Sequence, residues 1–91
     1  MIPAFAAAVR DRTLDRSAVQ VYLWLYDRLD VLEFRAIKQS AIQVDLDLSE
    51  PTVRFAIERL VERGYLAVGP RDDRVKTYRL FHSALTVNSA R

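Results

Sequence analysis

The chain has 91 residues, of which 51% are hydrophobic, so it can form one domain around a hydrophobic core. It contains no cysteine, which excludes disulfides and thiolate metal sites, and its two glycines are too few for a phosphate-binding loop or a dinucleotide fingerprint. The net charge of +2 is unevenly distributed: residues 15–50 carry four basic and seven acidic side chains, and residues 51–79 carry seven basic and four acidic ones.

The first third of the chain is expected to form two helices. A short helix over residues 3–10 would bury the apolar side chains of Ile2, Phe5 and Val9. A longer helix begins after Asp15, whose carboxylate can cap the first turn, and runs to about Leu29. The apolar opening of the chain is too short to span a membrane, and a cytoplasmic protein is expected.

The longer helix is apolar almost all round between residues 18 and 26. Such a helix is buried on more than one side, and in a small domain a second copy of the chain most simply covers the second side. A homodimer is therefore expected. The aromatic residues assigned to its interface, or else to the core, are Tyr22, Trp24 and Tyr26.

The middle of the chain alternates strand, helix and turn. Residues 34–37 can form a short edge strand, and residues 38–45 a helix that directs Ile42 and Leu46 inward. A tight turn follows at Asp47. The neighbouring carboxylates of Asp45 and Asp47 are explained by capping and solvation around this turn.

Residues 49–64 predict a helix with marked ends and two different faces. Ser49 can accept the backbone N–H of Thr52, Pro51 suits the first turn, and Gly64 suits a left-handed end. The apolar stripe consists of Val53, Ile57, Leu60 and Val61, with Ala56 at its edge. The opposite face carries Thr52, Phe55, Glu58, Arg59 and Glu62, with Arg54 on the flank.

Residues 65–80 predict a β-hairpin. Its strands cover residues 65–68 and 75–80, and Pro70 presets the second position of a turn between them. Leu66 and Val68 would pack inward opposite Leu80 and Tyr78. The cations exposed at the hairpin tip would be Arg71, Arg74 and Lys76.

The run from Leu48 to Leu66 resembles the recognition helix of prokaryotic winged-helix regulators. Its serine, Thr-Val-Arg and Leu-x-x-x-Gly elements are similar to the GntR style, and the hairpin that follows looks more like the MarR style. The resemblance covers about residues 14–81 and implies a winged helix-turn-helix, mainly α with a small β-hairpin wing and here an extra N-terminal helix. Residues 1–91 would form this single domain, with 82–91 as a tail. Two positions depart from the pattern: Asp47 replaces a usual glycine and Gln43 a usual alanine.

The resemblance implies sequence-specific binding of double-stranded DNA by a small homodimeric transcriptional regulator, a repressor associated with the nucleoid. The more basic half of the chain coincides with the helix and wing, as an electrostatic footprint on DNA would. The candidate contacts of the recognition helix are Ser49, Glu50, Pro51, Thr52, Arg54, Phe55 and Arg59. Those of the wing are Arg71, Arg74 and Lys76.

Other interpretations stay open. The same fold serves plasmid and phage replication-initiation or partition modules, and the acidic residues Glu50, Glu58 and Glu62 favour a protein partner instead of DNA. Ion pairs along the helix, such as Glu58 with Arg54 or Glu62 with Arg59, could also explain the arginines. Phe55 could meet a thymine methyl group, or it could be covered by a partner or by the N-terminal segment.

No enzyme, metal site or cofactor is expected from these residues. The one histidine, His82, has no second histidine or cysteine beside it, and Asp72 and Asp73 more simply shape the hairpin tip than bind a cation.

Overall fold

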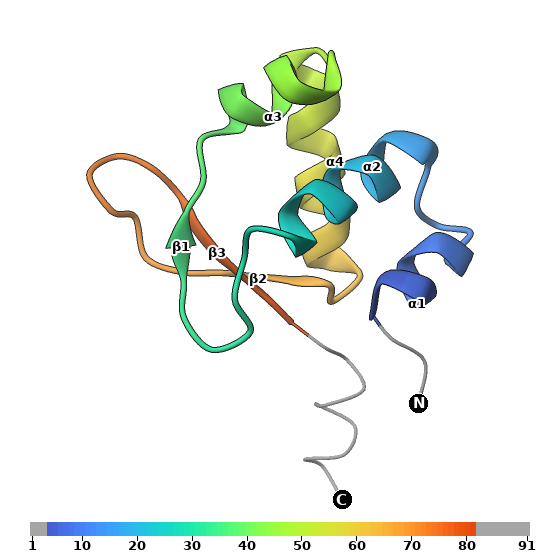
Figure 1. Cartoon of the computed structure of the whole chain (residues 1–91), viewed down its shortest axis with the longest axis horizontal. Coiled ribbons are helices and arrows are strands. Elements are labelled where there is room, and N and C mark those ends of the chain that lie inside the picture. Colours follow the sequence, from blue (N-terminus) through green and yellow to red (C-terminus); the bar gives the residue numbers. More distant parts are fainter. Residues whose placement is uncertain (1–3, 82–91) are drawn as a thin grey trace, which may run out of the picture.

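The computed structural model describes residues 4–81, which form four helices and a three-stranded sheet (Figure 1). The elements are α1 (Ala4–Arg10), α2 (Arg16–Tyr26), β1 (Arg35–Ala36), α3 (Gln39–Leu46), α4 (Glu50–Glu62), β2 (Leu66–Val68) and β3 (Thr77–Leu80). The sheet is antiparallel in the order β1–β3–β2, so the last strand is central. The predicted fold class is confirmed, and the predicted edge strand is β1, shortened to two residues.

Helix α2 begins where the sequence predicts but ends earlier. Asp15 is its N-cap, and the carboxylate accepts the backbone N–H of the residue three positions later at 2.8 Å. The helix stops at Tyr26, whereas the sequence predicts an end near Leu29. Leu29 is nevertheless buried, and the backbone N–H of Leu80 in β3 donates to the carbonyl of Asp30 at 2.9 Å. This contact with the sheet holds the chain in a turn where the local sequence favours a longer helix.

Helix α1 directs a different residue to the core from the one predicted. Val9 is 58% exposed, whereas Ala8 is fully buried. The side chains of adjacent helical residues point about 100° apart, so only one of Ala8 and Val9 can face α2. The small side chain of alanine allows the two helices to approach closely. The predicted burial of Val9 is therefore wrong. The predicted burial of Ile2 and Phe5 lies outside the described side chains.

The core lies between α2, α4 and the sheet, with α3 packed against both helices (Figure 1). Its buried side chains include those of Val21, Tyr22, Leu25, Ile42, Val53, Leu60, Leu66, Tyr78 and Leu80. The ring of Tyr22 packs against Tyr26 and Tyr65 at centroid distances of 5.9 and 5.3 Å. Burial raises the pKa of Tyr22. Because Tyr22 is fully buried in its own chain, it has no surface for a second subunit, and its assignment to a dimer interface is corrected.

The turn between α3 and α4 contains a left-handed residue that is not glycine. Asp47 has φ 54° and ψ 50°, and the backbone N–H groups of Asp47 and Leu48 both donate to the carbonyl of Gln43. Few residues other than glycine adopt this conformation, and aspartate is among the better tolerated because its short polar side chain can bond locally. The turn therefore keeps its usual geometry despite the departure in sequence.

Helix α4 has both predicted ends. Ser49 is the N-cap, its hydroxyl accepts the backbone N–H of Thr52 at 3.3 Å, and Pro51 lies in the first turn. At the other end Gly64 has φ 84°, the left-handed conformation that terminates a helix. Local side-chain chemistry therefore accounts for where this helix starts and stops.

Strands β2 and β3 and the residues between them (66–80) form the wing. Leu66 pairs with Leu80 and Val68 with Tyr78, which confirms the predicted register. Leu66, Tyr78 and Leu80 are buried, but Val68 is 52% exposed, so its predicted inward packing is wrong. The core ends before Val68, and this side chain lies at the surface beside α4.

The wing reverses at Asp73 and Arg74 and not at Pro70. Their φ angles are 51° and 69°, and Asp72 and Val75 on either side exchange two backbone hydrogen bonds of 2.9 Å. Two central residues with positive φ make a type I′ turn, whose twist suits a β-hairpin. Pro70 lies on the approach to this turn, so its fixed backbone angle does not set the reversal.

Candidate nucleic-acid interface

Helix α4 has a buried side and an exposed side, as its pattern predicts. The buried residues are Val53, Ala56, Ile57 and Leu60. The exposed residues from the N-cap onward are Ser49, Glu50, Pro51, Arg54, Phe55, Glu58, Arg59 and Glu62, and Thr52 is partly exposed. Every candidate contact predicted on this helix is therefore at least partly accessible from outside.

Two of the arginines on the exposed side are held by carboxylates of the same helix. Nη1 of Arg54 lies 2.7 and 2.9 Å from the two carboxylate oxygens of Glu50, and Nη1 of Arg59 lies 3.1 Å from Oε1 of Glu62. The Arg59 pair is one of the predicted pairs. Arg54 pairs with Glu50 and not with the predicted Glu58, because a glutamate four residues before an arginine is the better orientation.

Phe55 is 60% exposed on the outer side of α4. The guanidinium carbon of Arg54 lies 5.1 Å from the centroid of its ring, within range of a cation–π contact. Arg54 is thus in contact with Glu50 on one side and Phe55 on the other. Both contacts restrict the directions in which its guanidinium group can point.

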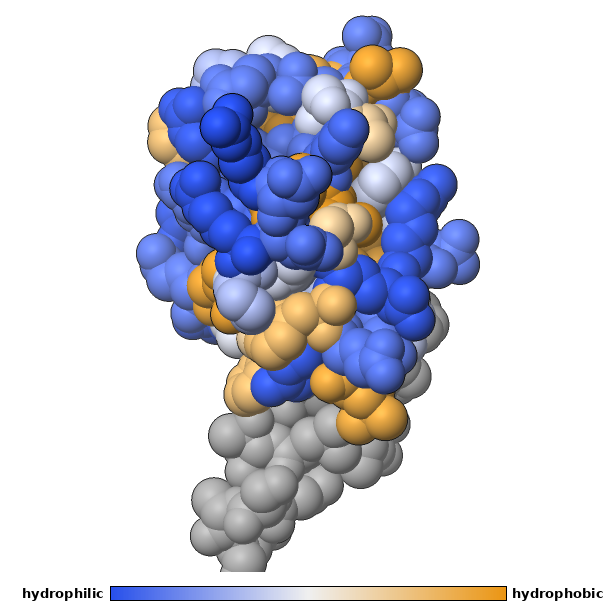
Figure 2. Space-filling view, turned by 90° about the vertical axis from the view of Figure 1, so that its left-hand side faces the viewer, coloured by the Kyte–Doolittle hydropathy of each residue, from blue (hydrophilic) through white to orange (hydrophobic). Residues whose placement is uncertain are grey.

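The cations of the wing differ from those of α4 because they are not paired with carboxylates of the described residues. Arg71, Arg74 and Lys76 are all exposed, and none of them forms an ion pair within residues 4–81. Figure 2 looks at the side of the molecule that carries the wing tip, where hydrophilic residues dominate and hydrophobic ones appear only in small groups. The wing therefore presents three exposed cations that no carboxylate of the described residues neutralises.

A groove of about 290 Å³ joins the wing to α4. Its lining residues are Gln39, Arg54, Ile57, Glu58, Val61, Glu62, Val68, Lys76 and Tyr78. The exposed Val68 borders this groove, and Arg54 of α4 and Lys76 of the wing both lie along it. Gln39, the first residue of α3, also reaches it, and no local signal in the sequence singles this residue out.

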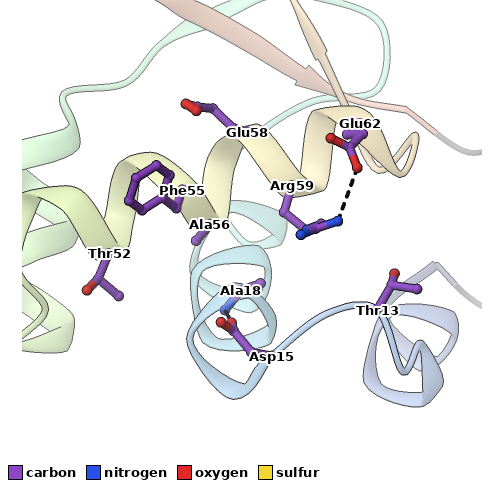
Figure 3. A pocket seen from close by; sticks show the side chains of 9 residues that line it. All are labelled: Thr13, Asp15, Ala18, Thr52, Phe55, Ala56, Glu58, Arg59 and Glu62. Carbon is purple, nitrogen blue, oxygen red and sulfur yellow. Dashed lines mark hydrogen bonds and ion pairs between the residues drawn. The ribbon is translucent and has the colours of Figure 1, made fainter.

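A larger cavity of about 590 Å³ lies on the other flank of α4, against the start of α2 (Figure 3). Figure 3 shows Ala56 pointing toward Ala18 of α2, with Arg59 and Glu62 paired at one edge. The other residues that line it are Thr13, Asp15, Thr52, Phe55 and Glu58. Phe55 and Arg59 thus belong both to this cavity and to the exposed side of α4. The sequence does not predict the cavity, because it forms only where α2 and α4 meet.

Asp11 connects the start of the domain to the end of α4. Its carboxylate accepts from the Thr13 hydroxyl at 2.6 Å and the Tyr65 hydroxyl at 3.0 Å, and lies 3.4 Å from Nε of Arg63. The hydrogen bond from Thr13 contributes most to lowering the pKa of Asp11 from 3.8 to about 2. Burial, together with donation to Asp11, raises the pKa of Tyr65 to about 12.

Replacing Asp11 by asparagine is expected to destabilise the domain by about 1–2 kcal/mol at neutral pH. The folded-state pKa of the carboxyl lies below its unfolded value of 3.8, so its contribution is complete above that value and is lost as the pH falls toward about 2. Urea unfolding from pH 7 to pH 2 measures this. The difference between the wild type and Asp11→Asn should be constant near neutrality and shrink below about pH 4. A difference that does not change with pH would contradict this role of the carboxylate.

Trp24 is tied to α3 within its own chain. Its indole Nε1 donates to Oδ2 of Asp45 at 2.8 Å, and the Arg28 guanidinium lies 3.8 Å from the ring centroid. Asp45 is exposed, as predicted for a solvated residue, and in addition it links α2 to α3 through this hydrogen bond. Trp24 is half-buried and Tyr26 is 36% exposed, so of the three aromatic candidates Tyr26 keeps the most surface for a second subunit.

Among the residues that the structure describes, no three histidine, cysteine, aspartate or glutamate side chains are grouped to hold a metal ion. His82 lies outside this range. Over the same part of the chain, no helix combines the length and the apolar character needed to cross a bilayer.

No protein-family model matches the sequence, and no curated protein does either. The structure is similar to the crystal structure of a MarR transcriptional regulator from Methanosarcina mazei Go1, with a TM-score of 0.63 and 18% sequence identity. The match covers 96% of this chain and 55% of that one, so this chain spans about half the length of the regulator. The GntR-like character of the recognition helix stays a prediction. At this identity the likeness concerns the fold, and the chain has the winged-helix fold.

Proposed function

We propose that this winged helix binds double-stranded DNA in a sequence-specific manner and acts as a small homodimeric transcriptional regulator, a repressor. The observation that carries the proposal is the groove between α4 and the wing. Arg54 and Lys76 lie along it, and the free cations of the wing tip continue beyond it. The structurally similar protein is described as a transcriptional regulator, which supports the same assignment.

The two elements have different tasks in this proposal. Helix α4 enters the major groove of the DNA, where Arg54, Phe55 and Arg59 meet base edges. Residues 49–52 at its start lie nearest the sugar-phosphate backbone of the DNA. Arginine suits this task because its planar fork can bind both acceptors of a guanine edge. The cations of the wing contact phosphates of the DNA. These contacts position the protein but do not distinguish one base sequence from another.

A protein partner in place of DNA is the second candidate. Glu58 and Glu62 stand beside Phe55 on the exposed side of α4, and carboxylates there repel phosphates. The carboxylates of Glu50 and Glu62 also neutralise the positive charges of Arg54 and Arg59 on this face. A surface of mixed charge around an exposed aromatic ring would suit a protein.

Competition between a selected duplex and a scrambled duplex, at fixed salt, tests the division of tasks. Arg74→Ala is expected to weaken binding to both duplexes by similar factors, because a phosphate contact is independent of sequence. Arg54→Ala or Arg59→Ala should lose about 1–3 kcal/mol more on the selected duplex. The selected duplex comes from a genome-wide pull-down of bound fragments.

The opposite pattern would contradict the assignment. If Arg74→Ala removed the discrimination between the two duplexes while both variants of α4 kept it, the wing would be the reading element and α4 its support. Footprints at an origin of replication instead of a promoter would favour the replication or partition role.

A further inference from the structure

Each arginine of α4 and of its C-cap already contacts a carboxylate of this chain. Arg54 is held by Glu50 and Arg59 by Glu62, while Arg63 lies 3.4 Å from Asp11. The cations of the wing have no such partner within residues 4–81. The element proposed to read bases thus has its cations neutralised, and the element proposed to bind phosphates has its cations free.

We propose that Glu50 and Glu62 are specificity-determining residues, each of which withholds an arginine of α4 from DNA that lacks the correct bases. This inference rests on the proposed function. Random DNA would be held mainly by the wing. The ion pairs Glu50–Arg54 and Glu62–Arg59 would open only where a base edge takes the place of the carboxylate.

The reason lies in what replaces the carboxylate when a pair opens. When a phosphate replaces the carboxylate, the arginine exchanges one anionic partner for another, so little binding free energy is gained. The released glutamate also lies beside the negative charge of the phosphate. A guanine edge offers two aligned acceptors in a groove away from the phosphates. The exchange therefore favours the correct site over random sequence.

The size of the effect follows from the exposure of these pairs. The side chains of Glu50 and Glu62 are 52% and 68% exposed, so solvent screens both pairs. Exposed pairs of this spacing change an equilibrium by about twofold. Each pair should lower the affinity for random DNA by about this factor, and the two together by about fourfold.

Glu58 provides a matched control. It lies between the two glutamates along α4 and is exposed like them, but it forms no ion pair within the described residues. Glu58→Gln removes the same charge from the same face without releasing an arginine. A comparison with it separates the loss of the pair from the general change in charge.

The experiment measures binding of the full chain to a selected and to a random duplex by fluorescence anisotropy over a range of salt. Glu50→Gln and Glu62→Gln should each raise the affinity for random DNA about twofold more, for each subunit, than Glu58→Gln does. Their log–log salt slopes should steepen by about one for each subunit, because a released arginine neutralises a further phosphate. The ratio of specific to random affinity should fall. Thermal unfolding checks that all variants fold.

Two results would overturn the inference while leaving DNA binding intact. If all three glutamine variants behaved alike, only net charge would matter. If Glu50→Gln or Glu62→Gln weakened the selected complex and left the random one unchanged, the glutamates would position the arginines and not withhold them. Failure of the wild type to bind any duplex would instead contradict the proposed function, and this inference with it.

Discussion

Raising the salt concentration from about 50 to about 200 mM is expected to weaken DNA binding by about 10³–10⁴-fold. A dimer that neutralises about six to eight phosphates releases the counterions condensed on them, which gives a log–log slope of roughly −5 to −7. We expect the free, exposed cations of the wing, Arg71, Arg74 and Lys76, to supply most of these contacts. A titration over this range of salt measures the slope directly.

A matched pair of variants shows where the phosphates bind. Lys76→Ala removes an exposed cation beside α4 and should reduce the slope by about one for each subunit. Arg10→Ala removes an exposed cation from the end of α1, which lies on the opposite side of the molecule from the wing tip (Figure 1). This variant should leave the slope unchanged. A wild-type slope near zero would favour a protein partner over DNA.

Replacing Gly69 by alanine is expected to destabilise the domain by about 1–3 kcal/mol or more, because no space exists for a methyl group. A Cβ at this position would lie 2.4 Å from the ring of Phe34 and 2.6 Å from the hydroxyl of Thr77. Thr77 is buried and cannot move aside. The ring of Phe34 would have to leave its place, where its centroid lies 5.3 Å from the Arg79 guanidinium. The contact between the loop before β1 and the wing would then be lost.

Gly64→Ala is the control for this prediction. Gly64 has φ 84°, and a methyl group added there would meet no atom of a non-adjacent described residue within 4 Å. Alanine at this position therefore meets only the backbone penalty of about 1 kcal/mol. The measurement is urea unfolding of both variants, which compares their losses of stability.

An equal loss of stability would mean that the contact between Gly69 and Phe34 is unimportant. Random-DNA binding should fall more for Gly69→Ala, since Gly69 and Thr77 belong to the wing and the clash between them distorts it.

Signals that act within one turn of chain are readable from the sequence. Ser49 and Gly64 set the two ends of α4 through a capping hydroxyl and a left-handed backbone, and Asp15 caps α2 in the same way as Ser49 caps α4. The period of the apolar residues in α4 likewise separates its buried from its exposed side. These features need no knowledge of the neighbouring elements, because the groups that interact are at most four residues apart.

Local signals were misleading at two positions. Pro70 suggested a reversal, but the type I′ turn formed three residues later at Asp73 and Arg74. Pairing of β2 with β3 in a fixed register decides which residues are left to form the turn. Arg54 had carboxylates within reach on either side, and the predicted pair with Glu58 neglected the preference for a glutamate four residues before an arginine, which Glu50 satisfies.

The sequence by itself determined the capped helix α4, because its caps and its apolar stripe rest on groups that are close together in the chain. The apolar pattern of residues 66–80 predicted the hairpin register and, together with α4, the winged-helix fold. Only the tertiary structure decided which apolar residues are buried, with Ala8 in place of Val9 and Val68 left at the surface. It also decided that Tyr22 belongs to the core and that Lys76 and Arg54 share one groove. The physical reason is that burial and ion pairing depend on what lies opposite a side chain, and residues distant in sequence supply that surface.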